Sequence, residues 1–463
     1  SVQKILKNKK ILFAFWRAES KEDAGYQHWY LPLKEIFGKV IVFDTSKIYF
    51  RYGKDKMNKK LLDYVKNEKP DYIFFDLVYD EIDIDTLLSI KKIYPKSKTI
   101  NLYSDDDWRY EDFSRFYAPF FDYSILTQNE INAYKKDKIK DITFIIGVNT
   151  SLLKPLPVKK KYDVTFWGRS RESRVELVRF LINRGVNVHI WGDGWAAYPD
   201  LQKHYHGHLS ADKLSQIICE SKINLAFTIG GYGKLELKGR AFEVSACKAF
   251  VLVEHFNDYS KYLAPDKELV MFKDKEELVK KIKYYLLHER KREEIASRAY
   301  ERVVSNYDQI TQFLNFFKKT FKNKEINVSK TILKPRKDCI ALNFNDLFIS
   351  SEILSKKIGK SNYIYFKDSN WKSLNYREEM QIYSLEKSSK DISCCDYYAS
   401  LKGLKRFLLF KASRAYFKLS KRDFSSLINV NQLMFTKDFF IKNRDKIIAF
   451  TEGKDIGIFN DDM

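Results

Sequence analysis

One stretch of the chain, residues 222–254, combines glycines, basic residues and carboxylates at spacings that suit a phosphate ligand. An apolar run of strand length, residues 222–228, is followed by Gly230, Gly231 and Gly233. Bare backbone N–H groups in a glycine-rich loop or at a helix N-terminus bind anions, and an adjacent Lys or Arg adds full positive charge. The stretch therefore indicates a nucleotide diphosphate site. The alternative is an ordinary connection between a strand and a helix through a flexible loop.

The charged residues of this stretch follow the glycines at short intervals. They are Lys234, Glu236, Lys238, Arg240 and Glu243. This set lies on an expected helix or just before it. Ala246 and Cys247 help to bury that helix. A carboxylate one turn inside such a helix can hold the hydroxyls of a ribose, as in dinucleotide sites.

Strand and helix patterns alternate from residue 10 to about residue 150. Several apolar runs are continuous, which is typical of parallel strands covered by helices on both faces. The polar residues at their C-terminal ends lie at the edge where open parallel sheets bind ligands. The expected strands are Ile11–Trp16, Val40–Asp44, Tyr72–Asp76, Thr99–Ser104, Tyr123–Thr127 and Ile142–Ile146, with helices such as Asn58–Asn67 and Gln128–Lys136 between them.

The same alternation begins again after a linker that contains Pro155 and Pro157. The expected strands here are Tyr162–Trp167, Val186–Trp191, Ile223–Thr228, Ala249–Glu254 and Leu269–Phe272, closed by helices at Lys275–His288, Arg290–Ser305 and Gln309–Lys322. We predict an α/β fold of two doubly wound, Rossmann-like domains, residues 1–154 and 155–325, that face a cleft. Such a cleft suits a reaction between two substrates, one held by each domain.

After Lys324 this alternation is lost, and short apolar runs mix with clusters of Lys and Ser. We expect residues 326–463 to form an additional module of mixed or mostly helical structure. The sequence does not indicate the role of this module.

Composition restricts the class of protein. The 463 residues carry a formal net charge of +22, which suggests an acidic partner: a phosphate-bearing substrate, an anionic membrane or nucleic acid. A lysine-rich solubilising surface explains the charge equally well. No apolar run approaches ~18 residues, so we expect no membrane-spanning segment. Five cysteines without metal-ligand spacing favour a reduced, cytoplasmic protein. The basic character of residues 330–463 makes peripheral association at the inner membrane face a further expectation.

Several short segments follow one another in the order of a known family. They are YDVTFWGRSRESR (162–174), VHIWGDGW (188–195), HGHLSADKL (206–214), KINLAF (222–227) and LKGRAFEVSAC (237–247), with NLYSDDDW (101–108) and FDYSILTQNEINAYKK (121–136) in the first domain. Through them, residues 1–325 resemble the glycosyltransferases related to spore maturation protein CgeB, of the two-Rossmann-domain GT-B class. The resemblance implies a metal-independent transferase without a cofactor. Its substrates would be a nucleotide diphosphate sugar and a glycan, lipid-linked glycan or protein acceptor.

The resemblance places the donor site in the second domain. Arginines after Gly168, at a helix N-terminus, would meet the diphosphate and stabilise it as it departs, although a solvated basic turn is the alternative. Lys238 and Arg240 match the diphosphate clamp of the class, and Glu243 matches its ribose ligand. The full donor-binding set is Gly168, Arg169, Ser170, Arg174, Gly192, Gly194, His208, Leu209, Lys238, Arg240 and Glu243.

Two features depart from simple patterns. Many retaining relatives place two glutamates with seven residues between them, whereas Glu236 and Glu243 have six between them, so neither the role of Glu236 nor the stereochemistry follows. His204, His206 and His208 alternate, but a fourth ligand is not evident and the fold class works without a bound metal. We therefore predict no metal site.

On the acceptor side, a carboxylate at the end of a first-domain strand could take the proton from an attacking sugar hydroxyl. The candidates are Asp105, Asp106 and Asp107, and the alternative is an acidic cluster that stabilises a helix N-terminus. The loop after the first strand is expected to shape the acceptor pocket through Arg17, Glu19, Gly25 and Tyr26.

Two further functions compete with sugar transfer. A sugar-nucleotide epimerase is compatible with the same fold. A non-enzymatic protein that binds nucleic acid or a membrane would use the positive charge, but no known nucleic-acid-binding module is visible.

Overall fold

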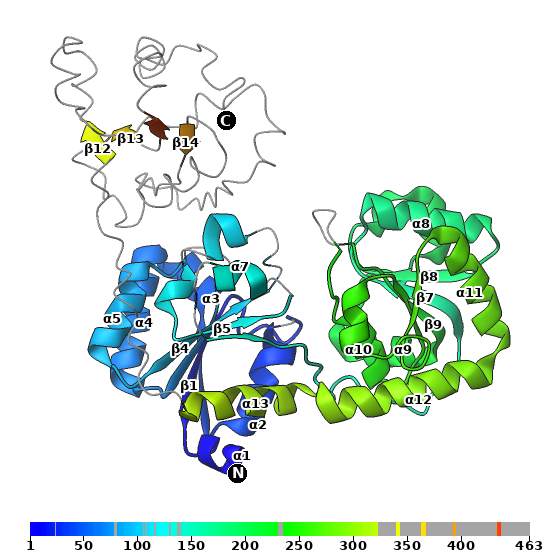
Figure 1. The fold of residues 1–463 in the computed structure, drawn as a ribbon, viewed down its shortest axis with the longest axis horizontal. Coiled ribbons are helices and arrows are strands. Elements are labelled where there is room, and N and C mark those ends of the chain that lie inside the picture. Colours follow the sequence, from blue (N-terminus) through cyan, green and yellow to red (C-terminus); the bar gives the residue numbers. More distant parts are fainter. Residues whose placement is uncertain are drawn as a thin grey trace, which may run out of the picture. The chain divides into compact units, whose positions relative to one another are not determined.

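The computed structural model describes residues 1–322, except 24, 78–80, 105, 107–108, 115–116, 129–130, 137–138, 140 and 230–234, together with four short strands beyond residue 338 (Figure 1). The chain divides into two compact units. The first combines Ser1–Trp108 with Phe120–Ile326, and the second combines Arg109–Pro119 with Asn327–Met463. All candidate site residues belong to the first unit.

The first sheet contains six parallel strands in the order β2-β1-β3-β4-β5-β6. These are β1 (Lys10–Phe15), β2 (Lys39–Asp44), β3 (Tyr72–Asp76), β4 (Lys98–Tyr103), β5 (Tyr123–Leu126) and β6 (Ile142–Phe144). Its helices are α1 (Val2–Leu6), η1 (Gly25–Tyr30), α2 (Leu31–Ile36), α3 (Thr45–Tyr52), α4 (Lys54–Glu68), α5 (Ile84–Ile93) and α7 (Ile131–Lys136). Two short helical segments, η2 (Tyr110–Ser114) and η3 (Ala118–Phe120), follow β4 in the chain.

The second sheet contains five parallel strands in the order β11-β10-β9-β7-β8. They are β7 (Tyr162–Trp167), β8 (Val188–Trp191), β9 (Ser221–Ala226), β10 (Val251–Glu254) and β11 (Val270–Phe272). The helices are α8 (Glu172–Asn183), α9 (Ala211–Glu220), α10 (Arg240–Ala246), α11 (Lys275–Leu287) and α12 (Glu289–Asn306), with short turns η4 (Trp195–Ala197), η5 (Pro199–His204) and η6 (Asn257–Lys261). The predicted strands are present with ends shifted by two residues at most, and the two parallel sheets with flanking helices confirm the predicted fold class.

Both sheets share one topology. In each, the first strand lies between the second and the third, and the remaining strands follow on the side of the third. The direction of strand order therefore reverses between β1 and β3 in the first sheet and between β7 and β9 in the second. Ligands of open α/β sheets bind outside the carboxyl ends of the strands at this reversal. Gly168 follows β7 and Thr228 lies shortly after β9, so both lie beside this point of the second sheet.

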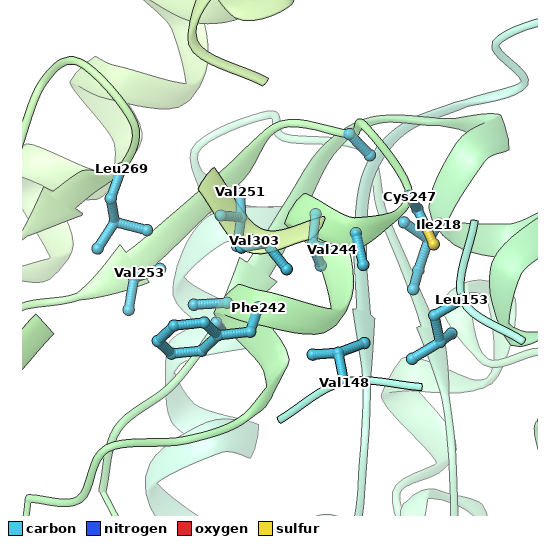
Figure 2. Close-up of a cluster of buried hydrophobic side chains, with 14 of the residues drawn as sticks. Val148, Leu153, Ile218, Phe242, Val244, Cys247, Val251, Val253, Leu269 and Val303 are labelled. Carbon is cyan, nitrogen blue, oxygen red and sulfur yellow. The ribbon is translucent and has the colours of Figure 1, made fainter. Parts of the chain in front are cut away.

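A continuous apolar cluster anchors α10 beneath the candidate site. Phe242 and Val244 of α10 pack with Val251 and Val253 of β10 and with Val303 of α12 (Figure 2). The less buried side chains of α10 include Arg240 and Glu243, which are three residues apart and so share one face of the helix. Burial of one face of α10 therefore leaves these two charged side chains on the other.

The last helix of the described chain, α13 (Gln309–Lys322), differs from expectation. The sequence pattern assigned it to the second domain, but Phe313, Phe316 and Phe317 are buried in the cluster that contains residues of β1 and β3. Thr320 Oγ1 also forms a 2.9 Å hydrogen bond with the hydroxyl of Tyr72 in β3. The apolar face of α13 thus packs on the first sheet, which a pattern of local spacing does not reveal.

In the second unit the structure describes one small mixed sheet with the order β12-β13-β15-β14. The strands are β12 (Cys339–Leu342), β13 (Tyr363–Phe366), β14 (Ile392–Cys394) and β15 (Leu433–Thr436). β12 and β13 are parallel, whereas β15 is antiparallel to both of its neighbours. Within the described part of the chain, every helix is too short or too polar to cross a bilayer.

Candidate functional site

Three glycines allow the ends of β7 and β8 to approach each other closely. Gly192 has φ 122°, and a Cβ atom on it would lie 2.4 Å from the carbonyl oxygen of Gly168. A Cβ atom on Gly194, which has φ 86°, would lie 2.2 Å from the Oγ atom of Ser170. Since side chains rarely adopt these φ values and no side chain fits these gaps, both positions require glycine. The predicted residues Gly168, Ser170, Gly192 and Gly194 are therefore brought together.

Hydrogen bonds fix this contact between the strand ends. The N–H of Gly168 donates to the carbonyl of Trp191 at 2.9 Å, and the N–H of Ser170 donates to that of Asp193 at 2.9 Å. The buried Trp195 donates its Nε1–H to the carbonyl of Gly168 at 2.7 Å. The backbone that precedes α8 is thus held from two sides.

The guanidinium groups of Arg174 and Arg240 converge on Gly168. A Cβ atom on Gly168 would lie 3.1 Å from Nη2 of Arg240 and 3.7 Å from Nη1 of Arg174. Both groups also lie over the ring of Phe166, with Cζ 5.1 Å from the ring centroid for Arg240 and 5.6 Å for Arg174. Arg174, on the first turn of α8, and Arg240, at the start of α10, are therefore neighbours although they are 66 positions apart in the chain.

The electrostatic environment of these arginines disfavours their positive charge. Burial, followed by the charges of Arg240 and Arg171, lowers the pKa of Arg174 to about 10. Burial likewise lowers the pKa of Arg240, and the Glu243 carboxylate opposes that shift. Nε of Arg240 and Nη1 of Arg171 are buried without a hydrogen-bond partner. Buried donors without partners are costly, so a bound anion would relieve both the repulsion and the missing bonds.

Glu243 lies in the first turn of α10, on the same side as Arg240. One of its carboxylate oxygens is 3.8 Å from the position of a Cβ atom on Gly239, the residue that precedes the helix. Among the described residues, no hydrogen bond or ion pair occupies this carboxylate. Glu243 is therefore available to accept hydrogen bonds from a ligand.

Lys238 is constrained more strongly than its predicted role suggests. Its ammonium pairs with the buried carboxylate of Glu236. The hydroxyl of the buried Tyr259 accepts from the N–H of Lys238 at 3.0 Å and donates to its carbonyl at 3.1 Å. Gln128 adds a 3.2 Å hydrogen bond to Glu236. The ammonium of Lys238 is thus one half of an ion pair.

The histidines in and after β8 have different partners. His208 is exposed and lies 3.1 Å from a carboxylate oxygen of Asp193, while the neighbouring Leu209 packs against the apolar cluster beneath α10. His206 lies 2.9 Å from His189, and His204 lies 2.9 Å from the carbonyl oxygen of Val188. No group of three His, Cys, Asp or Glu residues arranged for a metal ion occurs in the described part of the chain.

The acceptor-side residues surround the end of β1. The exposed Arg17 has φ 57° and donates its N–H to Ser46 Oγ at 3.2 Å. Glu19 pairs with Lys47 at 2.5 Å. Gly25 begins η1, and the ring of Tyr26 stacks on that of Tyr30 with centroids 4.9 Å apart.

Asp106 is the one described member of the predicted acidic triplet. Its side chain is 1% exposed and accepts a 2.7 Å hydrogen bond from the hydroxyl of Tyr134. Asp105 and Asp107 lie outside the described residues, as do Gly230, Gly231, Gly233 and Lys234 of the glycine-rich loop.

Sequence reasoning did not single out two residues at the site. Thr228 is fully buried, and Glu254, at the end of β10, accepts hydrogen bonds from it. Both lie at the C-terminal ends of predicted strands. A polar residue at that position was the signal in the sequence that could have identified them as site residues.

Comparisons with known proteins agree with this fold. Residues 169–315 match a family model described as glycosyl transferase-like. Sucrose-phosphate synthase from Thermosynechococcus elongatus is similar in structure (TM-score 0.51, 12% identity), over 68% of this chain and 99% of that one. A glycosyltransferase from Rickettsia africae is similar as well (TM-score 0.50, 14% identity), over 68% of this chain and 100% of that one.

No curated protein sequence matches the chain. The family match covers the segment that contains Arg169, Arg174, Arg240 and Glu243. In this segment the guanidinium groups of Arg174 and Arg240 converge on Gly168. The second domain is thus glycosyltransferase-like in sequence, and the two Rossmann-like domains have the GT-B fold.

Proposed function

We propose that this chain is a GT-B glycosyltransferase that transfers a sugar from a nucleotide diphosphate sugar to a glycan, lipid-linked glycan or protein. One observation carries the proposal: the guanidinium groups of Arg174 and Arg240 converge on Gly168 at the carboxyl edge of a parallel sheet without a carboxylate partner among the described residues. Arginine binds phosphate through paired N–H donors. The glycosyl transferase-like family match over residues 169–315 supports the assignment.

The arginines would act on the leaving group. Transfer of the sugar breaks the bond between its anomeric carbon and the diphosphate, and negative charge grows on the departing oxygen. Positive groups fixed in advance stabilise such charge without having to reorganise. The burial and mutual repulsion of Arg174 and Arg240 are already present in the fold, so the departing diphosphate meets a preformed cationic site. We propose that these cations serve in place of a bound metal.

Glu243 would hold the ribose of the donor. It is three residues from Arg240 on one face of α10, so a ribose beside the diphosphate lies within reach of its carboxylate. The proton of the acceptor hydroxyl requires a base on the first domain. Asp105, Asp106 and Asp107 remain the candidates, and Asp106 would have to exchange its hydrogen bond from Tyr134 for one from the acceptor.

Thermal denaturation with UDP, GDP and dTDP tests donor binding. A ligand at 100 times its Kd stabilises the folded state by about 2.7 kcal/mol, so the correct nucleotide will raise the Tm. Glu243→Ala should abolish or reduce this shift, whereas Glu276→Ala, which alters an exposed carboxylate paired with Arg184, should preserve it. If no nucleoside diphosphate raises the Tm, the donor site assignment is wrong.

Product analysis tests the reaction itself. Incubation with the nucleotide sugar that gives the largest Tm shift, without acceptor, should yield slow hydrolysis to free sugar and nucleoside diphosphate. Recovery of an epimerised donor would instead identify an epimerase.

A further inference from the structure

We propose that Glu254 is a positioning residue of the donor site: its carboxylate fastens the start of the glycine-rich loop at the sheet edge where the arginine cluster (Arg174 and Arg240) lies. The proposed effect on turnover rests on the glycosyltransferase function, whereas the effect on the loop does not. Glu254 ends β10, the strand next to β9, and therefore lies at the same sheet edge as Thr228.

One carboxylate oxygen of Glu254 accepts three hydrogen bonds from the chain that leaves β9. The donors are the N–H of Thr228 at 2.8 Å, the hydroxyl of Thr228 at 3.0 Å and the N–H of Ile229 at 3.2 Å. Hydrogen bonds to an ionised acceptor are about twice as strong as neutral ones. Three of them on two successive residues fix both the direction of the chain and the side-chain rotamer of Thr228.

Thr228, which Glu254 holds, also bonds to the residues that follow the glycine-rich loop. The carbonyl of Thr228 accepts the N–H of Glu236 at 3.0 Å, and Ile229 forms an antiparallel bridge with Leu235. Glu236 in turn pairs with Lys238, which lies two residues before Arg240. The two ends of the loop are thus joined at Thr228, and Glu254 holds Thr228 against the sheet.

Glu254 also contributes charge to the site. Its carboxylate opposes the lowering of the pKa of Arg174 by burial and by the neighbouring arginines, so it lies close enough to stabilise the charged form of that side chain. Among the described residues, no hydrogen bond or ion pair joins Glu254 to an arginine. Nη1 of Arg174 donates to the carbonyl of Arg169 at 3.0 Å, whereas Nε of Arg240 has no hydrogen-bond partner and is left for a ligand. The negative charge therefore has two opposing consequences: it fixes Thr228 and Ile229, and it weakens the attraction of the arginine cluster for a bare anion.

These consequences distinguish a positioning role from a purely structural one. A residue that only stabilises the fold would, when replaced, weaken every ligand in parallel. Glu254→Gln removes the charge with little change of shape, so it should loosen the chain at Thr228 and Ile229 while tightening the binding of a small anion that does not contact these residues. Inorganic pyrophosphate is a suitable probe, because it presents the diphosphate charge alone.

The experiment compares the full-length wild type with Glu254→Gln, Glu254→Asp and Thr228→Val. Hydrogen exchange of the Thr228, Ile229 and Glu236 amides is measured without ligand. Pyrophosphate affinity is measured by calorimetry, and kcat/KM is measured with the nucleotide sugar. For Glu254→Gln we expect exchange at these amides to rise about tenfold or more, pyrophosphate affinity to increase several-fold and kcat/KM to fall about tenfold or more.

The other variants separate the two effects. Glu254→Asp keeps the charge on a shorter side chain, so exchange should rise while pyrophosphate affinity stays near the wild-type value; it also serves if Glu254→Gln does not fold. Thr228→Val removes one of the three donors and should raise exchange less than Glu254→Gln does. Glu276→Gln, in the same domain, should leave all three measurements unchanged.

Unchanged exchange in both Glu254 variants would overturn the proposal, as would a loss of pyrophosphate affinity in Glu254→Gln that parallels a loss of global stability. If the wild type binds neither pyrophosphate nor any nucleoside diphosphate, the glycosyltransferase function fails. The exchange measurement still decides whether Glu254 fastens Thr228 and Ile229.

Discussion

The carboxyl edges of the two parallel sheets have the same topology but differ in how their charged side chains are paired. At the first sheet, Glu19 pairs with Lys47, and Asp44 accepts hydrogen bonds from Ser46 and from the N–H groups of Glu19 and Lys47. At the second, Arg174 and Arg240 converge without a carboxylate bound to either.

The difference shows which edge is prepared for a charged ligand. Carboxylates that already accept several hydrogen bonds gain little from a new partner, whereas buried donors without partners gain much. The shared topology predicts a ligand site at both edges. Among the residues that the structure describes, the second edge brings together two arginines without a carboxylate bound to either. The comparison thus predicts a tightly bound anionic donor on the second domain and a more weakly held neutral acceptor on the first.

The largest expected effect comes from removing Arg240. Arg240→Ala should lower kcat for sugar transfer by about 10²–10³-fold, the range for loss of one preorganised donor to a developing negative charge. Arg240→Lys should recover only part of the rate, because an ammonium lacks the planar pair of donors. Steady-state kinetics checks both.

A matched control for this substitution lies on α8. Arg179 is exposed and pairs with Asp200, so Arg179→Ala removes an arginine of the same domain without touching the cluster. Equal losses of activity in Arg240→Ala and Arg179→Ala would show that net charge, and not the cluster, governs the rate.

The next effect concerns Glu243. Glu243→Gln should weaken donor binding by about 1.5–3 kcal/mol, since hydrogen bonds from the ribose hydroxyls to a carboxylate are replaced by weaker ones to an amide. Calorimetry with the ribonucleoside diphosphate and its 2′,3′-dideoxy analogue isolates the contact. The wild type should strongly prefer the ribonucleotide, and the variant should discriminate much less. An unchanged preference would place the ribose elsewhere.

A smaller effect is expected at the first sheet. Tyr134→Phe removes a hydrogen bond to the buried Asp106 and should lower the free energy of unfolding by about 1.5 kcal/mol, as measured by urea denaturation. Donor affinity should not change.

The same pair tests Asp106 as the base. If Asp106 takes the acceptor proton, Asp106→Asn will reduce kcat far more than Tyr134→Phe at a comparable loss of stability. If both variants keep most of the activity, Asp105→Asn and Asp107→Asn are the remaining candidates.

The smallest effect is a dependence of stability on pH from the second sheet. Burial, followed by neighbouring positive charge, lowers the pKa of His189 and of His206, and their ring nitrogens share a hydrogen bond. Both histidines have a pKa near 6.5 when unfolded, so the unfolded state takes up protons first as the pH falls. Stability should therefore decrease modestly between about pH 7 and pH 5. In His189→Gln/His206→Gln this part of the pH dependence should disappear from thermal denaturation curves.

Local pattern determined much of the fold. Continuous apolar runs bounded by polar residues identified β1 to β11, because a strand buried on both faces must be apolar throughout. Gly168, Gly192 and Gly194, which follow strand ends, could also be predicted as site residues from the sequence. Close contact of backbones demands glycine at such positions. The helix α13 was assigned to the wrong sheet. Its aromatic face indicates that the helix is buried, but the sequence does not indicate against which sheet it packs.

The charges of the site were visible in the sequence, but their pairing was not. Lys238 and Arg240 read alike as clamps, yet the fold neutralises Lys238 with Glu236 and leaves Arg240 beside Arg174. The bonds from Thr228 to Glu254 likewise join residues 26 positions apart in the chain. Residue types and spacing determine which groups can carry charge, whereas only the tertiary structure decides which charges meet, because Coulomb interactions and hydrogen bonds depend on distances that the order of residues does not contain.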